Sequence, residues 1–188
     1  MASAERAQER RAKVKTILKD INTGEEKKIL DGLKTLKVNG DDNVIQPIIE
    51  VWNKGVSPVA EREIVTFLGD IKSTSSAQSI MDILLNEEYN EIHLALLTTI
   101  WNSKVDYSEY LVDFVTLAVR HDFMVALECL TIIENMEGPF EEHHILDAEI
   151  ILREFAEDHN ENKTEDEQKV QMIVEISNFI ASFDDLTL

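Results

Sequence analysis

Residues 58–90 read PVAEREIVTFLGDIKSTSSAQSIMDILLNEEYN, and apolar side chains recur in this stretch every three or four positions. That spacing is typical of helices that bury one face. It is interrupted by a run of Ser and Thr at residues 73–76, where hydroxyl groups can cap the start of a helix. The stretch is therefore expected to form two amphipathic helices joined by a short turn.

Variants of this helical pair occur before and after it. The first helix of each pair is expected at about residues 25–37, 58–71, 91–102 and 123–136, and the second at about residues 42–53, 76–87, 107–120 and 140–157. Corresponding positions lie 29–35 residues apart. One hairpin cannot bury its own apolar face, whereas stacked hairpins share a continuous core. The sequence thus predicts an all-α protein, an α-solenoid.

The first helices of the four pairs share three apolar positions, and we expect these to face the common core. The three aligned sets are Leu30, Val65, Leu94 and Leu127; Leu33, Leu68, Leu97 and Leu130; and Leu36, Ile71, Ile100 and Ile133.

The ends of the chain extend the stack. A helix over about residues 3–21 is expected to precede the hairpins, and one over about 168–183 to cover their open end. Residues 157–169, EDHNENKTEDEQK, contain no apolar side chain and are expected to form an exposed acidic loop. The predicted organisation is an N-terminal segment, four hairpins and a C-terminal segment: 1–24; 25–157, divided into 25–55, 56–88, 89–121 and 122–157; and 158–188.

The segments REIVTFLGDI (62–71) and AQSIMDILLNEE (77–88) resemble the two helices of a HEAT repeat. Pro47 also stands where many HEAT repeats carry proline. The resemblance covers roughly residues 25–157, although the third and fourth repeats lack the Leu-Gly pair of the first helix. It implies a right-handed superhelix of the armadillo type that binds other proteins, with the second helices lining the concave surface.

The formal charge of −19 is unevenly distributed, because residues 1–37 carry a net +4 and residues 38–188 a net −23. An acidic surface repels nucleic acid and anionic lipid and favours basic partners. No apolar run is long enough for a signal sequence or a membrane span. We therefore expect a cytoplasmic protein that binds neither nucleic acid nor membranes.

Four acids mark the most informative surface: Glu50, Asp82, Asp113 and Asp147. Each lies two residues after a core position of its second helix, about 200° around the helix, and so points away from the core. They are predicted to form a row that attracts a basic peptide or helix, with Tyr110 beside it as an aromatic contact. The simpler interpretation is that these carboxylates only provide solubility.

Catalytic and metal-binding motifs are absent from the sequence. His143 and His144 are adjacent, so their side chains diverge by about 100° and cannot share one ion well. The single cysteine, Cys129, aligns with core positions and is expected to pack there, as are Trp52 and Trp101 between repeats. No cofactor is predicted.

We conclude that the sequence favours a non-enzymatic protein-binding scaffold, present as a monomer or weak homodimer, whose partner is a protein or peptide of basic character. Two alternatives remain open. One is an enzyme of the lyase type found among HEAT-like proteins, and the other is a structural subunit that acts by self-association.

Overall fold

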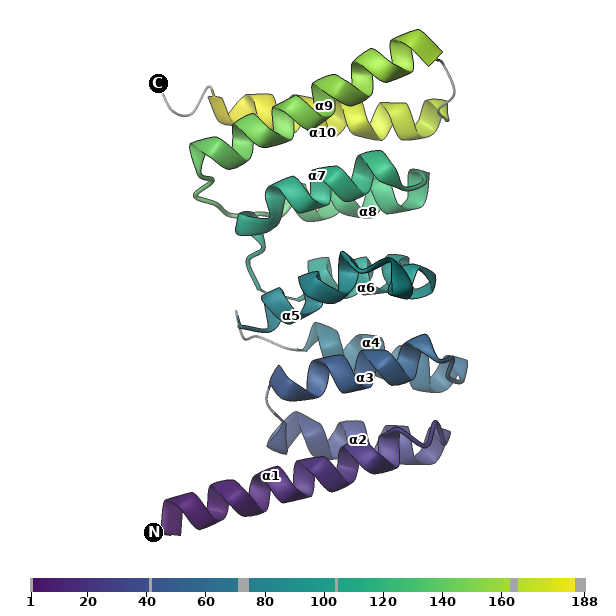
Figure 1. The fold of residues 1–188 in the computed structure, drawn as a ribbon, viewed down its shortest axis with the longest axis vertical. Helices are drawn as coiled ribbons and strands as arrows, with labels where there is room; N and C mark the ends of the chain where they lie inside the picture. The colour runs from purple at the N-terminus through teal and green to yellow at the C-terminus, as the bar shows by residue number, and fades with distance from the viewer. Residues whose placement is uncertain (1, 41, 71–74, 104, 163–165, 185–188) are drawn as a thin grey trace. The chain divides into compact units, whose positions relative to one another are not determined.

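The computed structural model describes residues 2–40, 42–70, 75–103, 105–162 and 166–184 (Figure 1). Every regular element in those residues is helical, which confirms the predicted all-α class. The chain divides into two compact units, residues 1–105 (unit 1) and residues 106–188 (unit 2). The division separates α6 from α7 and so cuts through the hairpin predicted at 89–121.

Unit 1 consists of helices that alternate between two layers (Figure 1). In one layer α1 packs on α3 and α3 on α5, and in the other α2 packs on α4 and α4 on α6. The α-helices are α1 (Ala2–Ile21), α2 (Glu26–Asn39), α3 (Ile45–Asn53), α4 (Pro58–Gly69), α5 (Ser75–Leu84) and α6 (His93–Asn102), with 3-10 turns η1 (Asp42–Val44) and η2 (Glu87–Ile92).

The core of unit 1 confirms part of the predicted register. Leu33, Leu36, Leu68, Leu97 and Ile100 are buried as expected. The first predicted set is wrong by one residue, because Leu30 and Val65 are only half-buried and Leu94 is exposed. The buried positions are Ile29, Ile64 and His93, which lie four residues before Leu33, Leu68 and Leu97 and so share their helix face. Ile71 lies outside the described residues.

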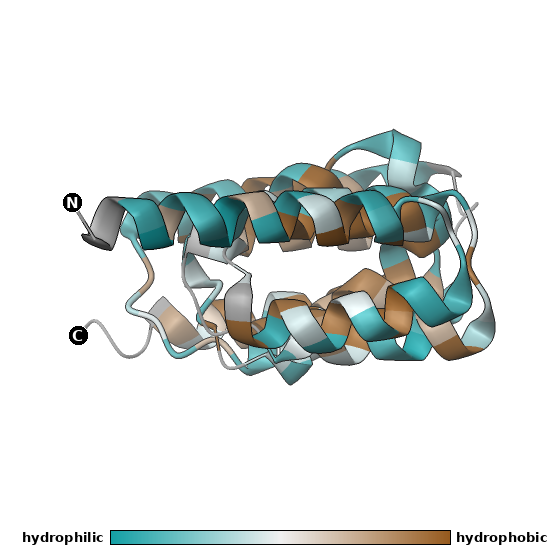
Figure 2. Ribbon diagram, turned by 90° about the horizontal axis from the view of Figure 1, so that it is seen from below, coloured by the Kyte–Doolittle hydropathy of each residue, from teal (hydrophilic) through white to brown (hydrophobic). Residues whose placement is uncertain are grey.

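Helix α1 is attached to unit 1 mainly through its second half. Its first half is mostly hydrophilic in Figure 2, and the strongly hydrophobic residues lie toward its C-terminal end. There Ile21 is fully buried against α2, where a Cβ atom added to Gly32 would lie 2.6 Å from Cγ1 of Ile21. Gly32 therefore allows the two helices to approach closely.

The start of α4 shows how local sequence sets a boundary. The Ser57 side chain accepts a hydrogen bond from the Ala60 backbone N–H at 3.2 Å, and Pro58 occupies the first helical position. Gly55, in the preceding turn, has a φ of 91°, a conformation that favours glycine. A serine before the first turn and a proline at the first helical position both favour the start of a helix here.

Unit 2 contains two more pairs of packed helices. Helix α7 packs on both α8 and α9, and α10 packs on α7, α8 and α9. The core includes Phe114, Cys129, Ile133, Ile176 and Ile180, all fully buried. The elements are η3 (Ser108–Tyr110), α7 (Leu111–Arg120), α8 (Phe123–Glu134), α9 (Glu142–Asn162) and α10 (Glu167–Asp184).

Helix α8 keeps part of the predicted register. Ile133 is fully buried and Leu130 nearly so, as expected, but Leu127 is half-buried and Ala126 is the buried residue before it. The same one-residue offset therefore occurs in α8 as in α2, α4 and α6.

The predicted loop at 157–169 is mostly wrong. Helix α9 continues through Asn162 and α10 begins at Glu167, while residues 163–165 lie outside the described residues. The loop was predicted from the polar composition of the segment alone. Residues 157–162 include no Gly or Pro that would end a helix. Lys169, predicted to be in this loop, is buried, and its Nζ donates a 3.0 Å hydrogen bond to the Val119 carbonyl.

The two tryptophans differ. Trp52 is 3% exposed and its indole N–H donates to Oε1 of Glu61 at 3.3 Å, so it packs in the core as predicted. Trp101 is 44% exposed, and the prediction that it is a packing residue between repeats is therefore wrong. It follows the buried Ile100 in α6 by one residue, which rotates its side chain about 100° from the core.

Candidate functional site: two acidic faces

All four predicted acids occupy the same helical register. Each follows a buried side chain by two residues, and none of the four acids is itself buried. The acid and its preceding core residue are Glu50 after Ile48 in α3, Asp82 after Ile80 in α5, Asp113 after Leu111 in α7 and Asp147 after Ile145 in α9. Because α3 packs on α5 and α7 on α9, each unit carries one pair of these acids on neighbouring helices.

In unit 1, each acid is fixed by a glutamine one turn earlier on its own helix. Nε2 of Gln46 donates to Oε1 of Glu50 at 3.1 Å, and Nε2 of Gln78 donates to Oδ1 of Asp82 at 2.6 Å. Each bond leaves the second carboxylate oxygen and the remaining lone pairs for other donors. We call this surface of α3 and α5, with Tyr89 beside it, the unit 1 acidic face.

A polar hollow of about 160 Å³ lies on the unit 1 acidic face. Its lining residues are Gln46, Ser79, Asp82, Ile83, Asn86 and Tyr89. The pKa of the Tyr89 phenol is raised above 10.0 by burial and by the negative charges of Glu50 and Glu88. The neutral phenol can therefore donate a hydrogen bond to an acceptor placed in this hollow.

Tyr89 was not predicted from the sequence. It lies in η2, beyond the last periodic turn of α5, so helical spacing gives no reason to place it beside Asp82. In contrast, Ser79 and Asn86 are three residues before and four residues after Asp82, and that spacing alone brings them to one side.

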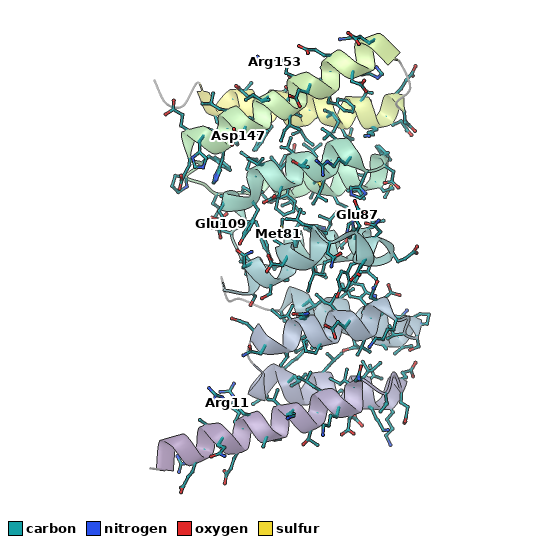
Figure 3. The ribbon with its side chains drawn as sticks, viewed as in Figure 1. Arg11, Met81, Glu87, Glu109, Asp147 and Arg153 are labelled. Carbon is teal, nitrogen blue, oxygen red and sulfur yellow. The ribbon has the colours of Figure 1, made fainter. Side chains whose placement is uncertain are left out.

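In unit 2 the corresponding surface combines acids with a histidine. Asp113 is half-buried in α7, and burial raises the pKa of its carboxyl above 3.8. The charge of His144 in α9 lowers the same Asp113 pKa, so the His144 ring lies near the Asp113 carboxylate. Asp147, labelled in Figure 3, is exposed one turn after His144 on α9. We call Tyr110, Asp113, His144 and Asp147 the unit 2 acidic face.

Tyr110 is held at the start of α7 by aromatic packing. Its ring centroid lies 6.1 Å from that of the buried Tyr107, which in turn contacts the core ring of Phe114 edge-on at 6.2 Å. Tyr110 itself is half-buried, so part of its side chain is open to solvent. A tyrosine anchored in this way loses little freedom when a partner packs on it.

The net negative charge of the chain is concentrated in unit 2. Residues 106–188 contain twenty-one Asp and Glu against four Lys and Arg, a formal net charge of −17 out of −19 for the chain. Unit 1 has sixteen acidic and fourteen basic residues and is nearly neutral at −2. The two acidic faces therefore have different electrostatic surroundings, and unit 2 attracts cations more strongly.

The part of the chain that the structure describes contains no group of three His, Cys, Asp or Glu side chains placed to hold a metal ion. Cys129 is fully buried, and burial together with Glu128 raises the pKa of its thiol far above the ordinary value. A buried neutral thiol is a poor nucleophile. Cys129 is thus a packing residue in unit 2, as its alignment indicates.

Comparison of the chain with protein-family models, with curated proteins and with solved structures gave no match. Among the described helices, none combines the length and apolarity needed to cross a membrane.

Proposed function

We propose that the chain is a non-enzymatic α-solenoid scaffold, built from HEAT-like hairpins between terminal helices, that binds a basic protein or peptide on its acidic faces. The observation that carries the proposal is the common register of the four acids. None of these four positions contributes a buried apolar side chain, and in each of α3, α5, α7 and α9 the position is a carboxylate that is exposed or half-buried.

The alternating helix contacts support the solenoid part of the proposal. Within each unit, a helix contacts the next helix but one along the chain, which is how successive hairpins of a solenoid stack. The acids belong to α3 and α5 in one unit and to α7 and α9 in the other, helices that HEAT-like repeats place on the binding surface.

The partner proposed is an extended or helical peptide rich in Lys and Arg. The hollow of about 160 Å³ at Tyr89 is too small for most ligands, whose pockets span about 300–1,000 Å³, but it accepts one side chain. Carboxylates held by glutamine in unit 1, and an anchored tyrosine in unit 2, offer charge-assisted hydrogen bonds and a flat apolar contact. The protein is proposed to act as a monomer or weak homodimer.

The test compares two variants of equal charge. One replaces the four acids of the faces: Glu50→Gln, Asp82→Asn, Asp113→Asn and Asp147→Asn. The other replaces four exposed acids on α2, α4, α8 and α10: Asp31→Asn, Glu63→Gln, Glu134→Gln and Glu175→Gln. Binding of a fluorescent Lys/Arg-rich peptide is measured by anisotropy at 0.15 M salt.

Exposed charge pairs contribute about 0.2–1 kcal/mol each, so four lost pairs weaken binding by about 1–4 kcal/mol, at least about fivefold. We expect that loss only for the first variant. An equal loss in both variants means that net charge alone attracts the peptide, and the proposal then fails. Circular dichroism of both variants confirms that the helices are intact.

A further inference from the structure

A groove of about 290 Å³ runs between α9 and α10, apart from the acidic faces. Leu152 and Ile173 form its buried floor, and Phe155, Ala156 and Val174 are partly or largely open to solvent. Its remaining lining residues are His159, Asn160, Val170, Ser177 and Asn178. The groove therefore has an apolar floor with polar groups beside it, as docking sites for helices do.

The groove is distinct from the unit 2 acidic face although both involve α9. Asp147 lies five residues before Leu152, so their side chains diverge by about 140° around the helix. A ligand in the groove therefore does not need to touch Asp147. The inference stands independently of the function proposed above.

The length of the groove fits a bound helix. Lining residues run from Leu152 to Asn160 on α9 and from Val170 to Asn178 on α10. Eight residues of helix rise about 12 Å, which matches two turns of a bound helix and the span of about 10.5 Å from its position i to i+7. Two or three apolar side chains at i, i+3 or i+4, and i+7 fit such a floor.

The negative charge of the two helices that form the groove favours a basic helix. Helices α9 and α10 carry ten Asp and Glu against two basic residues, Arg153 and Lys169. Lys169 is buried, its Nζ donating to the Val119 carbonyl and lying 5.4 Å from the Phe155 ring centroid. Only Arg153, labelled on α9 in Figure 3, is a surface cation on these two helices.

We propose that the α9–α10 groove binds a basic amphipathic helix of a partner protein, which inserts apolar side chains over Leu152 and Ile173 and directs Lys and Arg toward the surrounding carboxylates. A second copy of the chain is a poorer occupant, because two molecules of charge −19 repel each other.

The probe is a fluorescent 18-residue helix of Leu and Lys with Leu at i, i+3, i+4 and i+7, beside a scrambled peptide of the same composition. Val174→Glu and Ala156→Glu place a carboxylate within the groove, one from each helix. Ile150→Glu is the matched control, because Ile150 is 49% exposed, Val174 is 50% exposed, and Ile150 does not line the groove. All three variants change the net charge equally.

We expect the amphipathic peptide to bind wild type and Ile150→Glu at least tenfold more tightly than Val174→Glu and Ala156→Glu. We also expect it to bind wild type at least tenfold more tightly than the scrambled peptide does. Added negative charge strengthens a purely electrostatic attraction, so weaker binding in the groove variants requires apolar contact. Equal affinity of the two peptides, or equal behaviour of Val174→Glu and Ile150→Glu, overturns the proposal.

Two further measurements separate the groove from the other possibilities. Wild type and Val174→Glu are compared by sedimentation velocity, and self-association that Val174→Glu abolishes would identify a second copy as the occupant and overturn the proposal. The variant that neutralises the four acids of the faces is expected to keep its tenfold preference for the amphipathic peptide. Loss of that preference would assign the binding to the acidic faces instead.

Discussion

Gly32→Ala tests the close approach of α1 to α2. An Ala Cβ at this position would lie 2.6 and 2.7 Å from Cγ1 and Cδ1 of Ile21 and 3.2 Å from Cγ2 of Ile17. Ile21 is 1% exposed, so its side chain has little room to move away. Overpacking of this kind costs about 1–3 kcal/mol. Alanine recovers about 0.8–1.0 kcal/mol through its higher helix propensity, so we expect a net loss of about 1 kcal/mol.

The sign of this effect should reverse when Ile21 is shortened. Ile21→Ala alone leaves a cavity and costs about 2–5 kcal/mol. In that background the added methyl group of Gly32→Ala no longer meets Cγ1 or Cδ1, and the helix-propensity gain of up to about 1 kcal/mol remains. The double-mutant cycle should therefore give a favourable coupling of about 1–3 kcal/mol.

Urea unfolding followed by tryptophan fluorescence measures these changes, because both tryptophans lie in unit 1 with Gly32. Gly69→Ala is the control, since the nearest atom to its added Cβ is 3.9 Å away and the substitution should be neutral or stabilise by up to about 1 kcal/mol. If Gly32→Ala stabilises wild type as much as Gly69→Ala does, α1 does not lie this close to α2 and the argument is refuted.

Three further predictions concern single side chains. The Cys129 thiol should react with Ellman's reagent at pH 8 only after urea is added, because burial raises its pKa; rapid reaction of the folded protein would contradict this. Asp113→Asn should stabilise the protein at pH 7, because burial, only partly offset by His144, raises the Asp113 pKa and makes its ionisation unfavourable in the folded state. That advantage should grow as the pH rises through the window between 3.8 and the raised pKa, and thermal unfolding curves that show no such change would refute it. Trp101 in a Trp52→Phe variant should be quenched by iodide far more than Trp52 in a Trp101→Phe variant; equal quenching would contradict their different exposure.

The helices could be predicted from the sequence because most of their information is local. Apolar spacing predicted that Leu33, Leu68 and Leu97 lie in the core, and the helix expected from residue 58 begins there as α4. The one-residue error at Leu94 arose because a leucine was preferred over His93 as a core residue, although helix geometry turns the histidine inward. The position of a residue on the helix therefore predicted its burial better than its hydrophobicity did.

The site was predictable only within single helices. Ser79 and Asp82 share one side of α5 by spacing alone, and the structure places both in the same hollow. The approach of Tyr89 to Glu50, and of His144 to Asp113, depends on how two helices pack. The α9–α10 groove was missed for a different reason, because two of its five α9 lining residues, His159 and Asn160, lie in the segment expected to be a loop.

The scarcity of basic residues in unit 2 makes its ionic atmosphere part of its binding chemistry. With twenty-one carboxylates and four cationic side chains, most of the neutralising charge comes from dissolved ions. A basic partner displaces those ions, so its affinity falls as salt shortens the Debye length, from about 30 Å at 0.01 M to about 8 Å at 0.15 M. The strength of binding in unit 2 thus responds to ionic conditions without any change in its fold.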